Sequence, residues 1–391
     1  MKKIFLGFAF EKNRESELIK ACKSGVSMAV NQYQLGFLQG LDESIDIFSA
    51  TAIGAFPKKC RKLFFKKSTT DTEYGKITYL PFANFYFIRE WMFYRHTYRS
   101  LKASIDKKGQ NLIYVYSLYI PFMRAVKKLK KRNKNLHCSI IVTDLPGKYG
   151  FLADSHSFQA MKDKSEEKRK LKLAEIADSF VLLTETMAEV LPKRPYTVIE
   201  GFLPQQKFDY SNEREPKTIL YTGSLNVAFG VDKLLRAFEQ ITDPDFRLWI
   251  CGAGGIQSTI EEYAKKDNRI TYFGFLPKDK VAELQTRCDI LINPRSPHGE
   301  YTKYSFPSKT MEYLLSGSKV LMYRLPGMPE EYFKYIYTIN GDSASDIASA
   351  ILAASADTTF DARRTEQIEW IKTEKDNRTQ TKKLTELLDE I

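Results

Sequence analysis

The second half of the chain alternates short apolar runs with segments whose apolar residues recur at helical spacing. The run "TILYTG" at residues 218–223 ends in glycine, and "GVDKLLRAFEQI" at residues 230–241 then places its apolar side chains on one face. Three further apolar runs each lead through a glycine or proline loop into an amphipathic segment, at residues 245–255, 269–277 and 289–297. Repeated strand, loop and helix units predict a parallel sheet in a doubly wound α/β domain.

The first half shows the same alternation less regularly. Its strand candidates are separated by helical segments and lie at residues 2–10, 111–118, 137–147, 180–185 and 196–204. A polar, proline-bounded stretch that lacks apolar periodicity follows at residues 204–217 and is the best linker. We therefore expect one Rossmann-like domain at residues 1–203 and a second at residues 204–365, with a final helical segment at residues 366–391 that packs back across the junction.

Composition supports two domains and excludes several classes of protein. The chain has 391 residues, of which 43% are hydrophobic, so it can bury two cores. Its five cysteines form no C-x-x-C pair and its four histidines never fall at ligand spacing, which argues against a disulfide framework or a zinc site. The longest apolar stretches fall short of the roughly 20 residues that span a bilayer. These features predict a reduced, cytoplasmic chain without a transmembrane helix.

The formal net charge of +12 calls for an anionic partner. Part of it lies in "RAVKKLKKRNK" at residues 124–134, where helical spacing places Val126 and Leu129 on one side and lysines around the rest. One interpretation is a helix that lies on acidic lipid headgroups, at the inner face of the membrane. The other is a solvated helix that packs its apolar edge on a sheet. Nucleic acid is not expected as a partner, because no recognisable nucleic-acid-binding motif is present.

A short predicted helix, from about residue 308 to residue 316, follows the apolar run at residues 289–297. Ser305 and Ser308 are both suited to an N-cap, Pro307 suits a first turn, and Gly317 suits a C-terminal stop. Ligands of open parallel sheets bind at the carboxyl ends of the strands, in the loops that lead into such helices. The free N–H groups at the helix start, which carry a partial positive charge, are suited to a phosphate.

Lys309 and Glu312 lie three residues apart on one face of this predicted helix. Lys309 can neutralise a diphosphate while Glu312 accepts hydrogen bonds from vicinal hydroxyls such as those of a ribose. The alternative is an ordinary surface ion pair between the two side chains.

The ordered motifs of the second half resemble the nucleotide-sugar half of GT-B glycosyltransferases. The closest resemblance is to the retaining glycosyltransferase family 4 type that assembles bacterial surface polysaccharides. It rests on "GSLNVAFGVDKLLRAF", "LWICGAGG", "ITYFGFLP", "DILINPR" and "FPSKTMEYLLSGSKVL", and it extends over residues 218–339. The resemblance implies two Rossmann-like domains facing across a cleft, with the acceptor bound by the first and a nucleoside diphosphate sugar by the second.

The resemblance also implies roles for particular residues. Gly223 and Ser224 would lie beside the donor diphosphate, Phe275 and Leu276 would contact the nucleotide base, and Glu312 would bind the ribose. The donor-binding segment before and within the short helix would comprise Ser305, Phe306, Pro307, Ser308, Lys309 and Glu312. Two alternatives stay open, since Gly223 can simply end a strand and Phe275 can belong to a core.

Three charges that the family carries are missing from this chain. The first glutamate of the E-x7-E signature is Tyr304, the usual arginine is Ser224, and the usual lysine is Phe229. We expect Lys309 and Arg295 to supply the cationic stabilisation instead, although Arg295 can equally pair with a local carboxylate.

Candidates on the acceptor side are fewer. Asp144 ends a strand candidate and can orient an acceptor hydroxyl or act as a base, or it can cap the following turn. Glu300 can stand in for the glutamate lost at position 304, or can simply face solvent. The only D-x-D-like sequence, at residues 243–245, lies in a turn away from the ligand edge. We therefore expect catalysis without a metal ion, and no cofactor other than the donor substrate.

The leading hypothesis is a hexosyltransferase that moves a sugar from a nucleoside diphosphate sugar to a hydroxyl of a lipid-linked or oligosaccharide acceptor. Retention at the anomeric carbon and a role in cell-surface polysaccharide synthesis follow from the resemblance. The alternative is a non-catalytic GT-B-like partner subunit, which the three missing charges favour and the intact "FPSKTME" segment opposes. A GT-B-fold sugar-nucleotide epimerase has less support, because it should carry clustered acidic and histidine groups.

Overall fold

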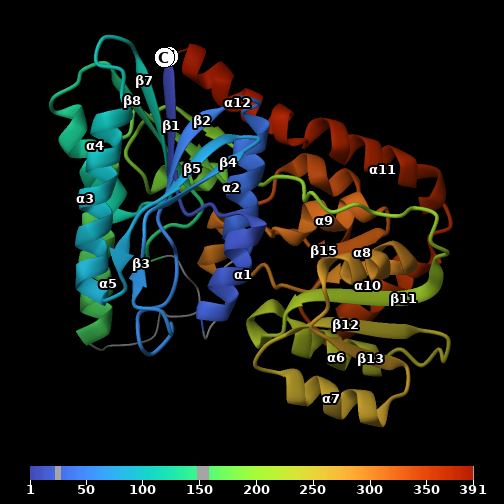
Figure 1. The fold of residues 1–391 in the computed structure, drawn as a ribbon. Coiled ribbons are helices and arrows are strands. Elements are labelled where there is room, and N and C mark those ends of the chain that lie inside the picture. The colour runs from blue at the N-terminus through green and yellow to red at the C-terminus, as the bar shows by residue number, and fades with distance from the viewer. Residues whose placement is uncertain (23–27, 148–157, 391) are drawn as a thin grey trace. The chain divides into compact units, whose positions relative to one another are not determined.

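The computed structural model describes residues 1–22, 28–147 and 158–390, which form two compact units (Figure 1). Unit 1 consists of Met1–Phe202 and Asn377–Ile391, and unit 2 consists of Leu203–Asp376. The chain therefore passes between the units twice. Among the described residues, no helix has the length and apolar character needed to cross a membrane.

Unit 2 is built on a six-stranded parallel sheet with the strand order β13-β12-β11-β14-β15-β16. Its strands are β11 (Glu215–Ser224), β12 (Arg247–Ala253), β13 (Ile270–Gly274), β14 (Cys288–Asn293), β15 (Lys319–Tyr323) and β16 (Ile336–Ile339). Its helices are α6 (Val231–Glu239), α7 (Gln257–Lys266), α8 (Lys278–Arg287), α9 (Lys309–Ser316), α10 (Ala344–Ala356) and α11 (Phe360–Glu374), with short 3₁₀ turns η2 (Val227–Phe229), η3 (Glu300–Tyr304) and η4 (Glu330–Lys334). The prediction of a doubly wound domain is confirmed, and the strand order reverses between β11 and β14.

The burial of these elements explains why the spacing of apolar residues in the sequence predicted them correctly. The centre of β14 is a continuous apolar run, Ile290 to Ile292, which is fully buried because helices cover both faces of a parallel sheet. In α6 the residues predicted to share one face, such as Leu234 and Phe238, are fully buried in the core of unit 2.

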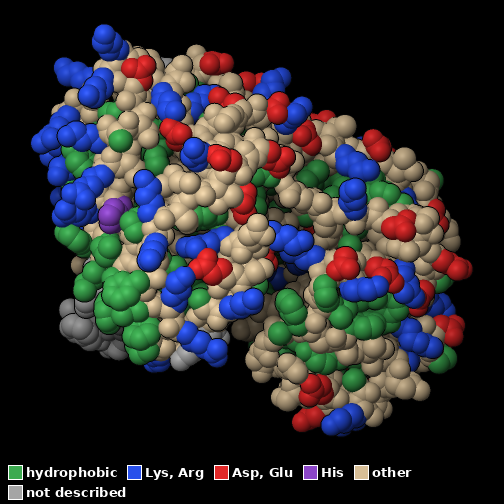
Figure 2. Space-filling view, viewed as in Figure 1, with side chains coloured by type: hydrophobic (Ala, Val, Ile, Leu, Met, Phe, Trp, Pro, Cys, Tyr) green, Lys and Arg blue, Asp and Glu red, His purple; other side chains and the backbone are tan. Residues whose placement is uncertain are grey.

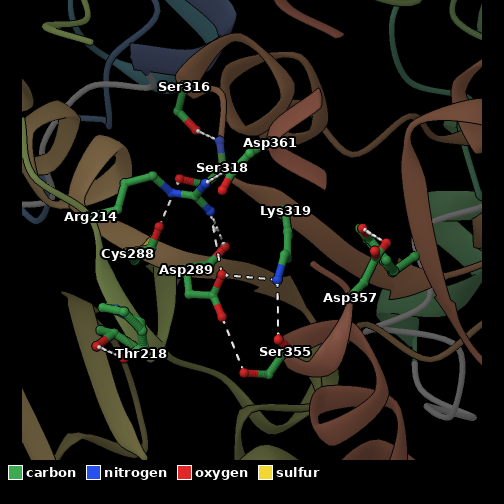
Figure 3. A network of polar contacts seen from close by, with 12 residues as sticks. Arg214, Thr218, Cys288, Asp289, Ser316, Ser318, Lys319, Ser355, Asp357 and Asp361 are labelled. Carbon is green, nitrogen blue, oxygen red and sulfur yellow. Dashed lines mark hydrogen bonds and ion pairs between the residues drawn. The ribbon is translucent and has the colours of Figure 1, made fainter. Parts of the chain in front are cut away.

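A buried polar network closes the amino edge of the unit 2 sheet, opposite the strand ends where ligands bind (Figure 3). Lys319 at the start of β15 is 4% exposed and lies 3.2 Å from Asp289 at the start of β14. Asp289 also pairs with Arg214 at 3.4 Å and accepts a hydrogen bond from Ser355 at 3.2 Å. Buried charges persist only when paired, so this network holds the starts of two strands and α10 together.

Unit 1 contains an eight-stranded sheet with the order β10-β9-β8-β7-β1-β2-β5-β4, parallel except for the edge strand β4. Its strands are β1 (Lys2–Gly7), β2 (Ile45–Ser49), β4 (Ser68–Thr72), β5 (Gly75–Tyr79), β7 (Asn111–Tyr116), β8 (Leu136–Val142), β9 (Ser179–Leu182) and β10 (Tyr196–Val198), with a separate pair β3 (Phe64–Phe65) and β6 (Phe82–Ala83). Its helices are α1 (Lys12–Ala21), α2 (Met28–Gly40), α3 (Tyr86–Ser104), α4 (Ile120–Lys130), α5 (Phe158–Ala174) and α12 (Asn377–Asp389), with the 3₁₀ turn η1 (Glu185–Glu189). A second Rossmann-like sheet is thus present, as expected.

The final helical segment is divided between the units. α11 belongs to unit 2, whereas α12 packs against α2 of unit 1. The Asn377 amide donates to the Gln39 side chain at 2.9 Å, and the Thr381 hydroxyl donates to the Gly40 carbonyl at 2.6 Å. Because Leu384 of α12 is 1% exposed, the end of the chain contributes to the core of unit 1.

The basic segment at residues 124–134 falls largely on α4. The apolar side of this helix, which includes Phe122, Val126 and Leu129, is buried in unit 1. The helix therefore packs its apolar edge in the core, and that edge is not available to a lipid surface. Lys128 is exposed on the outer side, whereas Lys130 pairs with Asp178 and donates to the Ile176 carbonyl at 2.8 Å.

Candidate functional site

Two loops meet where the strand order of unit 2 reverses. One follows β11 and leads to α6, and the other follows β14. At Gly230, which begins α6 with a φ of 76°, a Cβ atom would lie 2.1 Å from the carbonyl oxygen of Pro294. Only glycine allows both this left-handed conformation and so close an approach of the two loops. Crevices at such reversal points are the usual ligand sites of doubly wound sheets.

Gly223 and Ser224 lie at the carboxyl end of β11, as predicted, and Ser224 is exposed. The neighbouring end of β12 carries Gly252, where a Cβ atom would lie only 1.8 Å from the Gly223 carbonyl oxygen. A side chain at position 252 would therefore force apart the two strand ends, so this glycine keeps the backbone near the predicted diphosphate site compact. Gly252 was not predicted as a site residue, although the glycines of the "CGAGG" run were a signal for it.

The short helix α9 begins at Lys309 and ends at Ser316, and Gly317 follows in the left-handed conformation with a φ of 75°. The predicted helix and its glycine stop are confirmed. Ser308 occupies the N-cap position, but neither it nor Ser305 caps the helix through a side chain. Instead, the Thr310 N–H group donates to the carbonyl of Pro307 at 2.9 Å.

Lys309 and Glu312 form a two-point ion pair on the same face of α9. The Lys309 ammonium lies 2.8 and 2.9 Å from the two carboxylate oxygens of Glu312. The Glu312 side chain is 12% exposed, whereas that of Lys309 is 38% exposed. The ion pair between Lys309 and Glu312, which was the alternative interpretation, therefore forms. The lysine reaches solvent, whereas the glutamate is largely enclosed.

Gln285 of α8 holds Glu312 from the other side and is fully buried. Its amide donates to the Glu312 carboxylate at 2.7 Å and to the Thr222 hydroxyl at 3.4 Å. Beneath it, the Tyr313 hydroxyl accepts from the Thr222 N–H group at 3.1 Å and donates to its carbonyl at 3.0 Å. These contacts fix α9 against the end of β11. Gln285 was not predicted from the sequence, where its signal was a polar residue on the buried side of an amphipathic helix.

Arg295 lies in the loop after β14 and has no carboxylate partner among the described residues. Its guanidinium donates to the Ser305 hydroxyl at 2.8 Å and lies over the Tyr301 ring, 4.6 Å from the centroid. Within the described part of the chain, its buried Nε atom has no hydrogen-bond partner. The carboxylate pairing considered as an alternative is therefore wrong, and the guanidinium keeps its net charge.

The remaining residues of the donor segment differ in accessibility. Phe306 is 7% exposed and packs against Tyr332 in the core, so its side chain supports the loop from below. Pro307 is also buried, whereas Ser308 is exposed.

Phe275 and Leu276 lie in the loop between β13 and α8. Phe275 is 83% exposed, so the alternative that it belongs to a core is wrong. Leu276 is partly buried against the unit 2 core. Burial raises the pKa of the Cys251 thiol, while the Leu276 N–H group and the Lys309 charge act to lower it. The Leu276 N–H group thus contacts Cys251 at the carboxyl edge of the sheet, near enough to Lys309 for the lysine charge to act on the thiol.

Comparison with known proteins agrees with this geometry. Residues 216–357 match the family model described as "Glycosyl transferases group 1". Sucrose-phosphate synthase from Thermosynechococcus elongatus has a TM-score of 0.66 at 15% identity, with 100% of this chain and 99% of that chain covered. The Anabaena Alr3699/HepE structure in complex with UDP has a TM-score of 0.63 at 13% identity, with 100% of each chain covered. No curated protein sequence matches.

The fold is that of the GT-B glycosyltransferases. A third structure, Staphylococcus aureus TarM, has a TM-score of 0.55 at 14% identity and covers 79% of this chain and 60% of that chain. The family match and these likenesses together support a glycosyltransferase. The matched range contains all the predicted donor-binding residues of this GT-B chain.

The acceptor-side candidates lie in different units. Glu300 begins the 3₁₀ turn η3 of unit 2 and is exposed. Asp144 follows β8 of unit 1. Desolvation by the surrounding protein raises the pKa of its carboxyl, although the side chain reaches solvent. The Thr143 hydroxyl donates a hydrogen bond to this carboxyl at 3.4 Å, and that bond lowers the pKa in part. Asp243 and Asp245 of the D-x-D-like turn both pair with Lys217, at 2.8 and 3.2 Å.

Proposed function

We propose that this chain transfers a hexosyl group from a nucleoside diphosphate sugar to a hydroxyl of a lipid-linked or oligosaccharide acceptor. We further propose that the transfer retains the anomeric configuration and serves cell-surface polysaccharide synthesis. The observation that carries the proposal is the cationic carboxyl edge of unit 2. There, among the residues that the structure describes, Arg295 has no carboxylate partner, while Lys309 reaches solvent and Phe275 stands exposed.

Binding of the donor would exchange partners within the α9 ion pair. The diphosphate would accept hydrogen bonds from Lys309 and Arg295, and the ribose hydroxyls would donate to the Glu312 carboxylate. Gln285 already holds that carboxylate at 2.7 Å, so Glu312 would stay in place when Lys309 moves to phosphate. The exposed Phe275 would lie against the base. Three structures similar to this chain contain uridine nucleotides, which makes uridine diphosphate the first donor nucleotide to test.

Transfer requires the bond between the anomeric carbon and the diphosphate oxygen to break while the acceptor oxygen bonds to that carbon. The two cations would stabilise the negative charge that grows on the diphosphate as the bond breaks. This stabilisation lowers the activation barrier because the cations bind the transition state more tightly than the bound substrate. Asp144 and Glu300 are the candidates to orient the acceptor hydroxyl or take its proton. No step in this scheme uses a metal ion or a cofactor.

Calorimetry with uridine diphosphate in the presence of a chelator tests the proposal. Hydrogen bonds to charged groups contribute roughly 1.5–3 kcal/mol, so Lys309→Ala and Glu312→Ala should each weaken binding by about 10- to 150-fold. Lys280→Ala is the matched control, because Lys280 also forms an i,i+3 ion pair, with Glu283 at 2.9 Å on α8. Equal affinities in all three variants would contradict the donor site.

A non-catalytic partner subunit is the second candidate, favoured by Ser224, Phe229 and Tyr304 at positions where the resemblance implies charges. A panel of nucleotide sugars separates the two, because a bound donor raises the apparent melting temperature by mass action. If no nucleotide sugar stabilises the chain, the partner subunit becomes the better account.

A further inference from the structure

Four large apolar side chains are exposed at one end of α3 in unit 1. Phe85, Ile88 and Trp91 are 43%, 49% and 55% exposed, and their spacing of three residues places them on one face of the helix. Phe64 of β3 is 65% exposed and pairs across the strand with Ala83. Single exposed apolar residues are common on protein surfaces, but a contiguous group of this size marks an interaction site.

Phe64 lies beside the same part of α3. The N–H group of its cross-strand partner Ala83 contacts the sulfur of Met92 at 3.2 Å, and Met92 follows Trp91 on the helix. Lys67, two residues after β3, also lies near enough to His96 of α3 for its charge to act on the pKa of that imidazole. The pKa of His96 is lowered mainly by burial. The positive charges of Arg99, Arg95 and Lys67 lower it further.

Cations surround these apolar side chains. The segment "KKCRKLFFKK" at residues 58–67 carries six lysines and arginines, all of them exposed: Lys58, Lys59, Arg61, Lys62, Lys66 and Lys67. Further along the exposed face of α3 follow Arg95, whose guanidinium lies 5.2 Å from the Trp91 ring centroid, and Arg99. We call residues 58–67 together with the Phe85–Arg99 face of α3 the basic–aromatic surface. Figure 2 shows hydrophobic side chains grouped over β3 and the lower end of α3, with Lys and Arg side chains beside them.

Few acidic groups offset this charge. Glu17 accepts from Lys62 at 2.6 Å and also pairs with Arg14, so it neutralises part of one lysine. Glu90 accepts a hydrogen bond from the Tyr119 hydroxyl at 2.9 Å and is partly buried. The surface as a whole is therefore strongly cationic around an apolar centre.

We propose that the basic–aromatic surface binds an anionic lipid bilayer, with Phe64, Ile88 and Trp91 entering the interface and the surrounding cations contacting headgroups. Aromatic side chains favour the boundary between water and acyl chains, and lysines reach headgroups through long apolar stems. Each Lys or Arg near an anionic membrane contributes about 1 kcal/mol. A protein partner that matched this many cations would need an equally acidic surface around an apolar pocket, whereas an anionic bilayer supplies both chemistries.

This inference assigns membrane contact to residues other than the basic segment at 124–134, whose apolar side is buried on α4. It goes beyond the proposed transfer reaction and does not depend on it, because a bilayer can be bound by a chain that transfers no sugar.

Sedimentation of the full chain with vesicles of equal parts phosphatidylglycerol and phosphatidylcholine provides the first test. Lys66→Glu with Lys67→Glu should lower the partition coefficient more than about 10-fold, since each cation accounts for roughly 5-fold. The matched control is Lys265→Glu with Lys266→Glu, two consecutive exposed lysines on α7 of unit 2 with the same charge change. Equal losses in the two double variants would mean that net charge alone drives binding and would overturn the proposal.

A second test reports insertion directly. Acyl chains carrying bromine should quench the fluorescence of the wild type, because Trp91 is exposed while Trp249 and Trp370 lie in unit 2. Trp91→Phe should still bind vesicles but lose the quenching. Ile88→Ser should weaken binding several-fold, whereas Leu352→Ser, at a comparably exposed site on α10, should not. If the wild type does not sediment with these vesicles, or binds without quenching, the surface serves another partner and the proposal fails.

Discussion

At the scale of the residue, Asp144 shows how an environment changes the behaviour of one carboxyl. Its pKa is raised by desolvation, so the folded chain holds this proton more tightly than the unfolded chain does. As the pH rises from the unfolded pKa of about 3.9 through the folded value, the free energy of unfolding loses this contribution. Because the side chain also reaches solvent, screening reduces this contribution, and at neutral pH the ionised carboxyl opposes folding only weakly.

Asp144→Asn should consequently raise the free energy of unfolding at neutral pH, and the gain should vanish below about pH 4, where both states are protonated. Urea unfolding at several pH values measures this. Asp106→Asn is the opposing control, because the N–H groups of Lys108 and Gly109 lower the pKa of Asp106, so its replacement should reduce stability at neutral pH. A less stable Asp144→Asn at pH 7 would show that the carboxylate is needed structurally.

The side-chain contacts of the donor segment could be predicted from the sequence only where both partners lie within a few residues of each other. The spacing of three between Lys309 and Glu312 fixes their proximity on any helix, and the structure pairs them. The contact between Gln285 and Glu312 joins residues 27 positions apart, and no local pattern contains it. The same limit applies to Arg295, whose partner Ser305 depends on the path of the loop between them.

At the scale of the element, hydrogen bonds from several neighbours hold α9 in place, and one of them runs from Gln367 of α11 to the Leu314 carbonyl at 2.9 Å. Tyr313 ties it to β11 and Gln285 ties it to α8. The site residues on α9 should therefore respond to changes in α8 that never touch a ligand.

Gln285→Leu keeps the size of the side chain and removes its hydrogen bonds. One lost hydrogen bond is worth about 0.5–1.5 kcal/mol, so affinity for uridine diphosphate should fall by roughly 2- to 13-fold as Glu312 loses its fixed orientation. Gln257→Leu on α7, which breaks a 2.9 Å bond to Glu261 at the surface, is the control and should bind normally. If Gln285→Leu is less stable to urea but binds uridine diphosphate with wild-type affinity, Gln285 contributes to stability and not to the orientation of Glu312.

Elements buried on both faces were the ones that the pattern revealed. Strands such as β11 and β14 read as continuous apolar runs between helices, and periodicity located them correctly. The strands β2, β4 and β5 of unit 1 were missed. β4 has the sequence STTDT, lies at the edge of the sheet and buries none of its side chains fully, so it carries no apolar signal.

At the scale of the whole molecule, the division into units depends on residues far apart in the sequence. The sequence indicated a linker near residue 204, and the chain passes from unit 1 to unit 2 after Phe202. The return at Asn377 lies inside a stretch that is helical on both sides, α11 and α12, so composition did not mark it.

Removal of residues 377–391 should lower the stability of unit 1 and leave that of unit 2 unchanged. Leu384 is 1% exposed, and its loss with the rest of α12 would uncover the face of α2 that it covers. Calorimetric scans that resolve two transitions measure the effect. Leu384→Ala is a milder version and should cost about 2–5 kcal/mol in unit 1 alone. An equal shift of both transitions would mean that the two units unfold together.

The return of the chain to unit 1 also sets an order of events during translation. Unit 2 is contiguous and can fold as soon as its last strand and helices have left the ribosome, whereas the earlier-made unit 1 still lacks α12. The core of unit 1 therefore cannot be completed until α12 has been made and has reached α2. Until then, the face of α2 that α12 covers stays exposed, and this late contact links the two ends of unit 1.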